Sequence, residues 1–254
     1  MRESESLERV AGKNEVCVKK ILWWIRELLF PRRCPVCDKP VRPAGHLICD
    51  TCKGKLKYIS EIHCMKCGKP LAAETEEYCS DCKKKKHKFI QGKSVYEYKS
   101  AAGMIYRFKY GKRQEYAEFL GREMVVRFEE DIRRWKAQAL IPVPIHKSRK
   151  RRRGYNQAEL LAVEISKRTG IPVKKNLLVR CKKTVPLKML KDAERQNNLK
   201  KAFKIGKNDV KLSTIIIIDD IYTTGSTVNE MADVLNKVGI DKIYVLTLAI
   251  GSVN

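Results

Sequence analysis

Residues 215–227, IIIIDDIYTTGST, decide how the rest of this chain folds. Four consecutive isoleucines are typical of a central strand in a parallel sheet, because helices cover such a strand on both faces. Asp219 and Asp220 follow where the apolar run ends. Open α/β sheets bind ligands at the carboxyl ends of their strands, so these carboxylates are placed to accept hydrogen bonds from a sugar diol.

The second half of the stretch predicts a phosphate-binding turn. Small hydroxyl side chains and a glycine lead into a helix, whose first backbone N–H groups are free to bind an anion. The ordinary alternative is a strand end whose aspartates cap the next helix, which does not explain why these residue types occur together. The candidate ligand residues are Asp219, Asp220, Tyr222, Thr223, Thr224, Gly225, Ser226 and Thr227.

The segments on either side alternate between strand and helix patterns. Helices are predicted at about 101–110, 115–136, 156–168 and 226–238, and further apolar strands at 139–143 and 243–250. Gly239 ends the last of these helices. The alternation predicts a doubly wound parallel α/β sheet.

The N-terminal third carries a regular array of cysteines. Eight of the ten cysteines form four Cys-x-x-Cys pairs at a fifteen-residue repeat: Cys34 and Cys37, Cys49 and Cys52, Cys64 and Cys67, Cys79 and Cys82. A reducing compartment favours metal over disulfides, and two such pairs offer zinc four thiolates, so we expect two structural zinc ions. Sequential use of the pairs is favoured over alternate use because each closing loop is shorter. Cys17 and Cys181 are predicted to be buried core residues.

The chain divides by composition into three parts. Residues 1–30 hold an N-terminal tail and an amphipathic helix over 17–30, residues 31–87 form the zinc module, and residues 88–254 form the α/β domain. The 17–30 helix is too short to span a bilayer, and docking onto protein is favoured over peripheral membrane contact. We expect no transmembrane segment. The acidic start, MRESESLERV, argues against an export signal and predicts a cytoplasmic protein.

Charge points to an anionic partner. Lysine and arginine number 54 against 29 acidic residues, a net charge of +25, and the densest run is KSRKRRR at 147–153. Neutralising several phosphates would give salt-sensitive binding of single-stranded DNA, with tyrosines such as Tyr58, Tyr106 and Tyr110 as stacking faces. A solvated helix face or a solubilising surface is the alternative. The candidate DNA-binding residues are Lys150, Arg151, Arg152, Arg153 and Tyr155.

Residues 215–227 resemble the phosphoribosyl-pyrophosphate (PRPP) motif of type I phosphoribosyltransferases. The order of parts resembles the ComF/GntX family from about residue 17 onward. The shared blocks are FPRRCPVC at 30–37, the cysteine array, IPVPIH at 141–146, RGYNQ at 153–157, and ERQNNL at 194–199 leading to Ala202 and Phe203. One departure is Leu187, which stands where the family commonly carries a glutamine before the ERQNNL block.

The resemblance implies a type I phosphoribosyltransferase-like sheet behind a double zinc ribbon, with PRPP bound together with Mg²⁺. It places the pyrophosphate at His146, Lys147 and Arg149, and it implies a role in DNA uptake during natural transformation, with a motor ATPase as a partner.

Three functions remain open. The first is an accessory protein that binds PRPP–Mg and single-stranded DNA. The second is an active phosphoribosyltransferase that releases pyrophosphate, and the third is a non-catalytic PRPP sensor. The zinc array and the charge favour the first. The chain ends just after its last strand, so we expect any hood over a nucleobase to come from residues 101–136. No catalytic residue is assigned.

Overall fold

The computed structural model describes residues 29–181, 202–206 and 211–251. Almost all of the predicted 17–30 helix lies outside these residues, as do Cys17, Leu187 and the block at 194–199. The chain separates into two compact units, Met1–Lys53 and Gly54–Asn254. Among the described residues, no helix is both long enough and apolar enough to cross a membrane.

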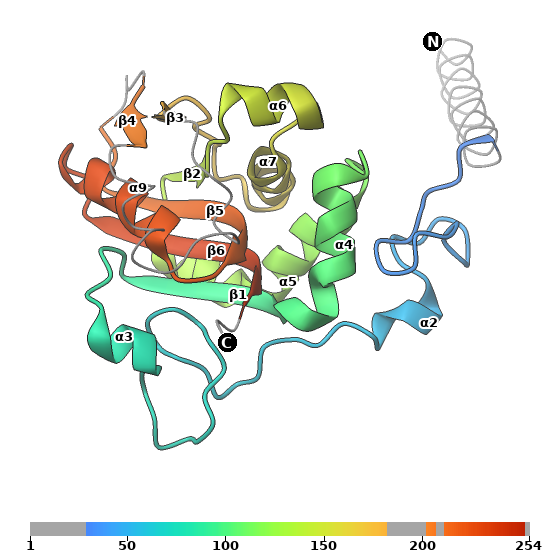
Figure 1. Cartoon of the computed structure of the whole chain (residues 1–254), viewed down its shortest axis with the longest axis horizontal. Coiled ribbons are helices and arrows are strands. Elements are labelled where there is room, and N and C mark those ends of the chain that lie inside the picture. Colours follow the sequence, from blue (N-terminus) through green and yellow to red (C-terminus); the bar gives the residue numbers. More distant parts are fainter. Residues whose placement is uncertain (1–28, 182–201, 207–210, 252–254) are drawn as a thin grey trace, which may run out of the picture. The chain divides into compact units, whose positions relative to one another are not determined.

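A sheet of four parallel strands organises the second unit, in the order β1-β6-β5-β2 (Figure 1). Its strands are β1 Gln91–Glu97, β2 Ala139–Pro142, β5 Thr214–Tyr222 and β6 Lys242–Ile250. β5 lies between β6 and β2, and its isoleucines at 215–218 are fully buried. This confirms the prediction of a central strand covered on both faces.

Helices lie on both faces of this sheet, which confirms the predicted doubly wound α/β class (Figure 1). The longer helices of this unit are α4 Tyr98–Tyr110, α5 Tyr116–Trp135, α6 Lys147–Arg153, α7 Gln157–Thr169 and α9 Ser226–Asn236. α5 and α7 pack together on one face, and α9 contributes Val228, Met231 and Leu235 to the core on the other. A separate two-stranded sheet pairs β3 Leu178–Arg180 with β4 Phe203–Ile205 in antiparallel orientation.

Three features differ from the sequence prediction. β5 continues to Tyr222 because β6 pairs with it as far as Ile250, so the two aspartates lie in the last part of the strand and not beyond it. β1 was missed because its sequence, QGKSVYE, is largely polar. Cys181 was predicted to be buried but is exposed, because it stands just past the last residue of β3, outside the paired strands.

The two cysteine ribbons repeat one local geometry. In the first unit, the N–H of Cys34 donates to the Lys39 carbonyl at 2.8 Å, and the chain reaches the short helix α2, Asp50–Lys53. In the second unit, the N–H of Cys64 donates to the Lys69 carbonyl at 2.7 Å, and the chain reaches α3, Ser80–Lys84. The equivalent turns, thirty residues apart, show that two fifteen-residue repeats build one ribbon and that the ribbon occurs twice.

The second ribbon packs onto the sheet. The N–H of Ile59 donates to the Val95 carbonyl at 3.0 Å, and the N–H of Gly92 donates to the Lys66 carbonyl at 2.8 Å. Cys64, Cys67 and Cys79 belong to the same buried cluster as the inward-facing isoleucines of β5. This ribbon therefore shares a hydrophobic core with the α/β fold.

Candidate functional site

The eight paired cysteines form two groups of four, and the groups use the pairs sequentially. One group is Cys34, Cys37, Cys49 and Cys52, and the other is Cys64, Cys67, Cys79 and Cys82. Within each group all four sulfur atoms lie within 4.8 Å of one another. The Sγ atoms of Cys67 and Cys79 are 3.7 Å apart. A tetrahedron with Zn–S bonds of about 2.3 Å has S···S edges of about 3.8 Å, so this edge of the second group has the length that zinc requires.

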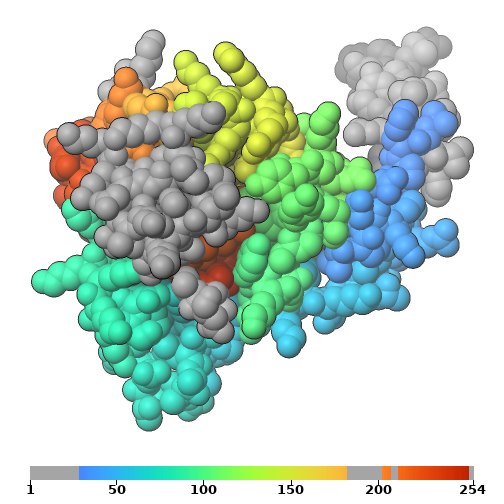
Figure 2. Space-filling view, in the orientation of Figure 1, coloured from blue at the N-terminus to red at the C-terminus, as the bar shows by residue number. Residues whose placement is uncertain are grey.

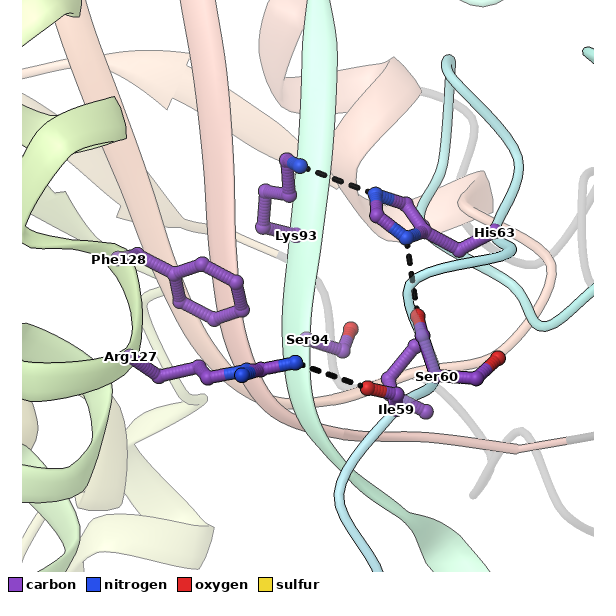
Figure 3. Close-up of a pocket in the computed structure, with 8 residues that line it drawn as sticks. Ile59, Ser60, His63, Lys93, Ser94, Arg127 and Phe128 are labelled. Atoms are coloured by element: carbon purple, nitrogen blue, oxygen red, sulfur yellow. Dashed lines mark hydrogen bonds between the residues drawn. The ribbon is translucent and has the colours of Figure 1, made fainter.

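A polar junction joins the second ribbon to β1 and α5 (Figure 3). Lys93 Nζ donates to His63 Nε2 at 3.0 Å, and His63 Nδ1 faces the Ser60 carbonyl at 3.0 Å, which makes it the protonated nitrogen of a neutral ring. Arg127 donates to the Ile59 carbonyl at 3.2 Å. The cavity between these groups holds about 20 Å³, enough for a water molecule and no more. We therefore interpret the junction as a contact that holds the second ribbon on β1 and α5, since its cavity is too small for a larger ligand.

A much larger cavity, of about 520 Å³, opens at the carboxyl ends of β2 and β5. Its size is within the range of small-molecule binding sites. Seven of the eight predicted ligand residues line it: Asp219, Asp220, Tyr222, Thr223, Gly225, Ser226 and Thr227. Thr224 is buried, and its hydroxyl lies 2.8 Å from that of Ser226. The structure thus brings the sequence-predicted motif together around one cavity.

The two carboxylates differ in their surroundings. Asp220 Oδ2 pairs with Lys109 Nζ of α4 at 2.8 Å, while Asp219 Oδ1 accepts the Asp220 backbone N–H at 2.8 Å. Burial, reinforced by the neighbouring charge of Asp220, raises the pKa of Asp219 to about 7. Asp219 therefore changes charge near neutral pH, and a bound ligand or cation that favours the carboxylate form would shift this balance.

Residues 223–227, which we call the phosphate loop, turn sharply into α9. Gly225 has a φ of +73°, and a Cβ at this position would stand 2.3 Å from the Tyr222 hydroxyl. Only glycine fits there. Because the next residue begins an eleven-residue helix, the first N–H groups of α9 are available to an anion.

The basic run divides between two faces of α6. Arg149, Arg152 and Arg153 line the cavity. Lys150 instead pairs with Glu159 at 3.7 Å. Arg152 and Arg153 lie three and four residues after Arg149, so these three side chains share a face of the helix. Figure 2 shows α6 at the surface of its unit.

The predicted pyrophosphate residues separate in the same way. Arg149 lines the cavity, but His146 and Lys147 do not. His146 caps α6, its Nδ1 accepting the N–H of Ser148 at 3.2 Å. Arg180, which the sequence did not single out, also lines the cavity. Burial, and next the charge of Arg149, lower the pKa of Arg180 to about 10. Two guanidinium groups thus approach each other where an anion would relieve their repulsion.

Tyr155 corrects the prediction of a base-stacking residue. It is buried, with its hydroxyl donating to the Phe108 carbonyl at 2.6 Å, so its ring is not available to a base. Tyr58 is exposed and donates to Glu123 at 2.6 Å, away from the cavity. Besides Tyr222, the aromatic residues of the cavity wall come from α4: Tyr98, and Tyr106 and Tyr110, whose ring centres lie 5.1 Å apart.

Lys109 and Gln157 are cavity residues that sequence reasoning missed. Lys109 lies in an ordinary helical pattern, and nothing near it in the sequence marks it as a partner of Asp220. Gln157 lies in the RGYNQ block at 153–157, but the sequence predicts no ligand-binding role for this residue. Its Oε1 accepts from Arg153 at 2.8 Å, and its Nε2 is buried without a partner among the described residues. A donor of this kind is available to a ligand.

Comparison with known proteins agrees with this arrangement. A double zinc ribbon domain model matches residues 25–83, and a phosphoribosyl transferase domain model matches residues 149–252. The chain is therefore a phosphoribosyltransferase-type α/β protein that carries a double zinc ribbon.

Relatives that align over most of their length show which family of such proteins the chain belongs to. Competence protein F of Haemophilus influenzae is 31% identical over 226 residues, covering 87% of this chain and 97% of the relative. DNA utilization protein YhgH of Escherichia coli K12 is 28% identical over 87% of this chain and 98% of its own length. Competence protein ComFC of Bacillus subtilis is 28% identical over 76% of this chain and 79% of its own. The chain belongs to the ComF family, which is related to DNA uptake.

Among solved structures, one of those with a detectable similarity is an enzyme. A purine phosphoribosyltransferase from Pyrococcus horikoshii aligns with a TM-score of 0.34 at 20% identity, over 52% of this chain and 73% of that one. A similarity of this size shows neither a substrate nor an activity.

Proposed function

We propose that the large cavity binds PRPP together with Mg²⁺. The single observation that carries this proposal is that the paired carboxylates and the phosphate loop line one cavity. The ribose diol would donate to Asp219 and Asp220, and the 5′-phosphate would accept from the phosphate loop and the first turn of α9. The pyrophosphate would then face Arg149 and Arg180.

The residues present fit a magnesium ion that arrives with its ligand. Mg²⁺ usually keeps several waters and binds through one or two carboxylates and the phosphates of a substrate. The cavity offers two carboxylates, one of them already paired with Lys109. Zinc, in contrast, is proposed as a resident ion of each four-cysteine group, where the sulfur spacing fits it.

We also propose that single-stranded DNA binds beside this cavity. The support is the net charge of +25, the basic face of α6 and the exposed rings of Tyr106 and Tyr110. Phosphates would contact Arg152 and Arg153, with Lys150 and Arg151 on the outer face of the same helix, and bases would stack on the tyrosines. This function suits a cytoplasmic DNA-uptake protein that works with a motor ATPase.

Phosphoribosyl transfer is a second candidate function. The observation that favours it is the Nε2 of Gln157 in the cavity wall, which has no hydrogen-bond partner among the described residues. Arg153 donates both to Gln157 Oε1 and to the Tyr110 hydroxyl, so Gln157 lies near a tyrosine of α4. A planar acceptor could receive a hydrogen bond from Gln157 there and stack on an aromatic ring. A PRPP sensor would bind the same ligand without releasing pyrophosphate, so the release of pyrophosphate separates the two functions.

Calorimetry tests the proposal. Wild-type protein should bind PRPP–Mg²⁺, and the double variant Asp219→Asn/Asp220→Asn, which keeps the shape of both side chains, should lose at least a hundredfold in affinity. Two charge-assisted hydrogen bonds at roughly 1.5–3 kcal/mol each account for such a loss. A labelled oligonucleotide should bind wild type and this double variant alike. Undetectable PRPP binding in the wild type, or unchanged affinity in the double variant, would exclude the PRPP site.

A further inference from the structure

Residues 87–89 link the second ribbon to the phosphate loop. They follow α3 and run beside the first turns of α9. His87 Nδ1 lies 2.8 Å from Asn229 Nδ2, and the backbone N–H of Lys88 donates to Asn229 Oδ1 at 3.1 Å. Lys88 also forms an ion pair with Asp233, one turn further along α9. The segment after the last zinc knuckle is therefore tied at three points to the helix that begins at the phosphate loop.

These bonds define the state of the His87 ring. Because Asn229 Oδ1 accepts from Lys88, the amide nitrogen of Asn229 must face His87 and donate to it. His87 Nδ1 is thus an acceptor, and in a neutral ring the proton is on Nε2. Burial lowers the pKa of His87, which is consistent with a neutral ring. The contact with Asn229 is consequently directional.

The same ring packs against the glycine of the phosphate loop. His87 Cε1 stands 3.1 Å from the position that a Cβ on Gly225 would take. His87 also packs on Phe89, with ring centres 5.0 Å apart, and Phe89 meets the buried ring of Tyr222 edge-to-face at 6.2 Å. The phosphate loop therefore rests on three rings, two of which belong to the segment that leaves the second ribbon.

The first knuckle of the second ribbon contacts β1 and one of these rings, since Lys66 Nζ lies 5.5 Å from the centre of the Phe89 ring. Gly68 follows Cys67 with a φ of +77°, and a Cβ there would stand 2.9 Å from the Gly92 carbonyl oxygen of β1. Cys67 and Cys79 share a buried cluster with Phe89 and Tyr222. A knuckle that lost its metal would be free to move away from β1, and the packing around Phe89 would loosen with it.

We propose that the second ribbon positions the phosphate loop, with His87 as the positioning residue, so that metal occupancy of the second cysteine group sets the affinity for PRPP–Mg²⁺. The first cysteine group lies in the other compact unit and serves as the internal control. This inference rests on the proposed function for its ligand, but the position of the loop can also be measured without any ligand.

Substitutions at His87 test the positioning role while leaving all eight cysteines in place. His87→Ala removes the acceptor for Asn229 and should weaken PRPP–Mg²⁺ binding about fivefold, the equivalent of one ordinary hydrogen bond of about 1 kcal/mol. His87→Asn places an amide oxygen near the original Nδ1 and should recover most of the affinity. Lys86→Ala, at the exposed neighbouring position, should bind as wild type does. Equal affinities for His87→Ala and wild type, or for His87→Ala and His87→Asn, would overturn the role of His87.

The two ribbons are compared with matched cysteine variants, because Cys82 and Cys37 are both partly exposed members of their groups. Hydrogen–deuterium exchange of residues 222–229, without ligand, should accelerate in Cys82→Ser and His87→Ala and stay unchanged in Cys37→Ser. Zinc analysis should find one ion fewer in each cysteine variant, and circular dichroism checks that the sheet remains folded. Unchanged exchange in both Cys82→Ser and His87→Ala would refute the inference. A wild type that does not bind PRPP, yet shows the predicted exchange pattern, would refute only the proposed ligand.

Discussion

Replacing Lys109 by methionine should lower the free energy of unfolding, because Lys109 is the cation that pairs with Asp220. Lys109 Nζ lies 2.8 Å from Asp220 Oδ2, and the two side chains are 18% and 11% exposed. At that separation and an effective dielectric constant of about 20, the attraction is about 6 kcal/mol before desolvation is subtracted. Removing one partner of a buried pair costs about 3–5 kcal/mol. Because the cavity admits some water, we expect about 3 kcal/mol at pH 8.

The loss should shrink as the pH falls. Asp219 has a pKa raised to about 7 in the fold, well above its unfolded value. The cost of its ionised form is therefore full above pH 7 and decreases steadily as the pH falls from 7 toward the unfolded pKa. Without Lys109 the penalty is larger, and protonation at pH 5.5 relieves more of it. Urea unfolding of Lys109→Met and wild type at both pH values measures the difference. Lys99→Met, an exposed lysine of the same helix, is the control. A loss below about 1 kcal/mol at pH 8, or one that is equal at both pH values, would show that the pair is not formed as described.

Three further predictions concern ligands. PRPP–Mg²⁺ affinity should fall about tenfold between pH 8 and pH 6 because Asp219 must give up its proton, whereas Asp219→Asn should lose that part of the dependence on pH. Replacing Arg152 and Arg153 by alanine should weaken single-stranded DNA binding equally for all sequences, and it should reduce the slope of log affinity against log salt by about 1.4. Arg151→Ala, a change away from the cavity wall, should weaken DNA binding less. Equal losses in the two variants would mean that the DNA binds elsewhere. Gly225→Ala should abolish PRPP binding with the sheet intact, since its Cβ would meet the Tyr222 hydroxyl; calorimetry showing wild-type affinity would contradict the loop geometry.

The parts of the fold that the sequence predicts are those whose cause is local. The isoleucine run, the glycine turn and the cysteine repeat each act within about fifteen residues, and the structure places them as expected. β1 escaped prediction because its stability comes from pairing with β6 and from the second ribbon, while its own side chains are mostly polar. Lys109 escaped because its role exists only once α4 lies over the end of β5.

The basic run at 147–153 shows what amino-acid composition alone does not predict. Its composition predicts an anion site, but composition assigns all six charges to the same role. Once the run is a helix, Arg149, Arg152 and Arg153 fall on the cavity face, and Lys150 turns to Glu159. The helical period contains this division in principle. The sequence does not predict this division, because the highly charged run has no apolar stripe from which a helix could be inferred.

The two ribbons show how a sequence repeat can acquire two roles. The knuckles have the same spacing and the same turn geometry, so nothing in the cysteine array distinguishes one from the other. What differs is the chain that follows: after Cys82 come His87 and Phe89, whose rings support the phosphate loop. Zinc binding supplies folding free energy to whatever the knuckle holds in place. At the second ribbon that includes Tyr222 and Gly225, so under our proposal an ion there would contribute to the proposed ligand site as well as to the stability of the ribbon.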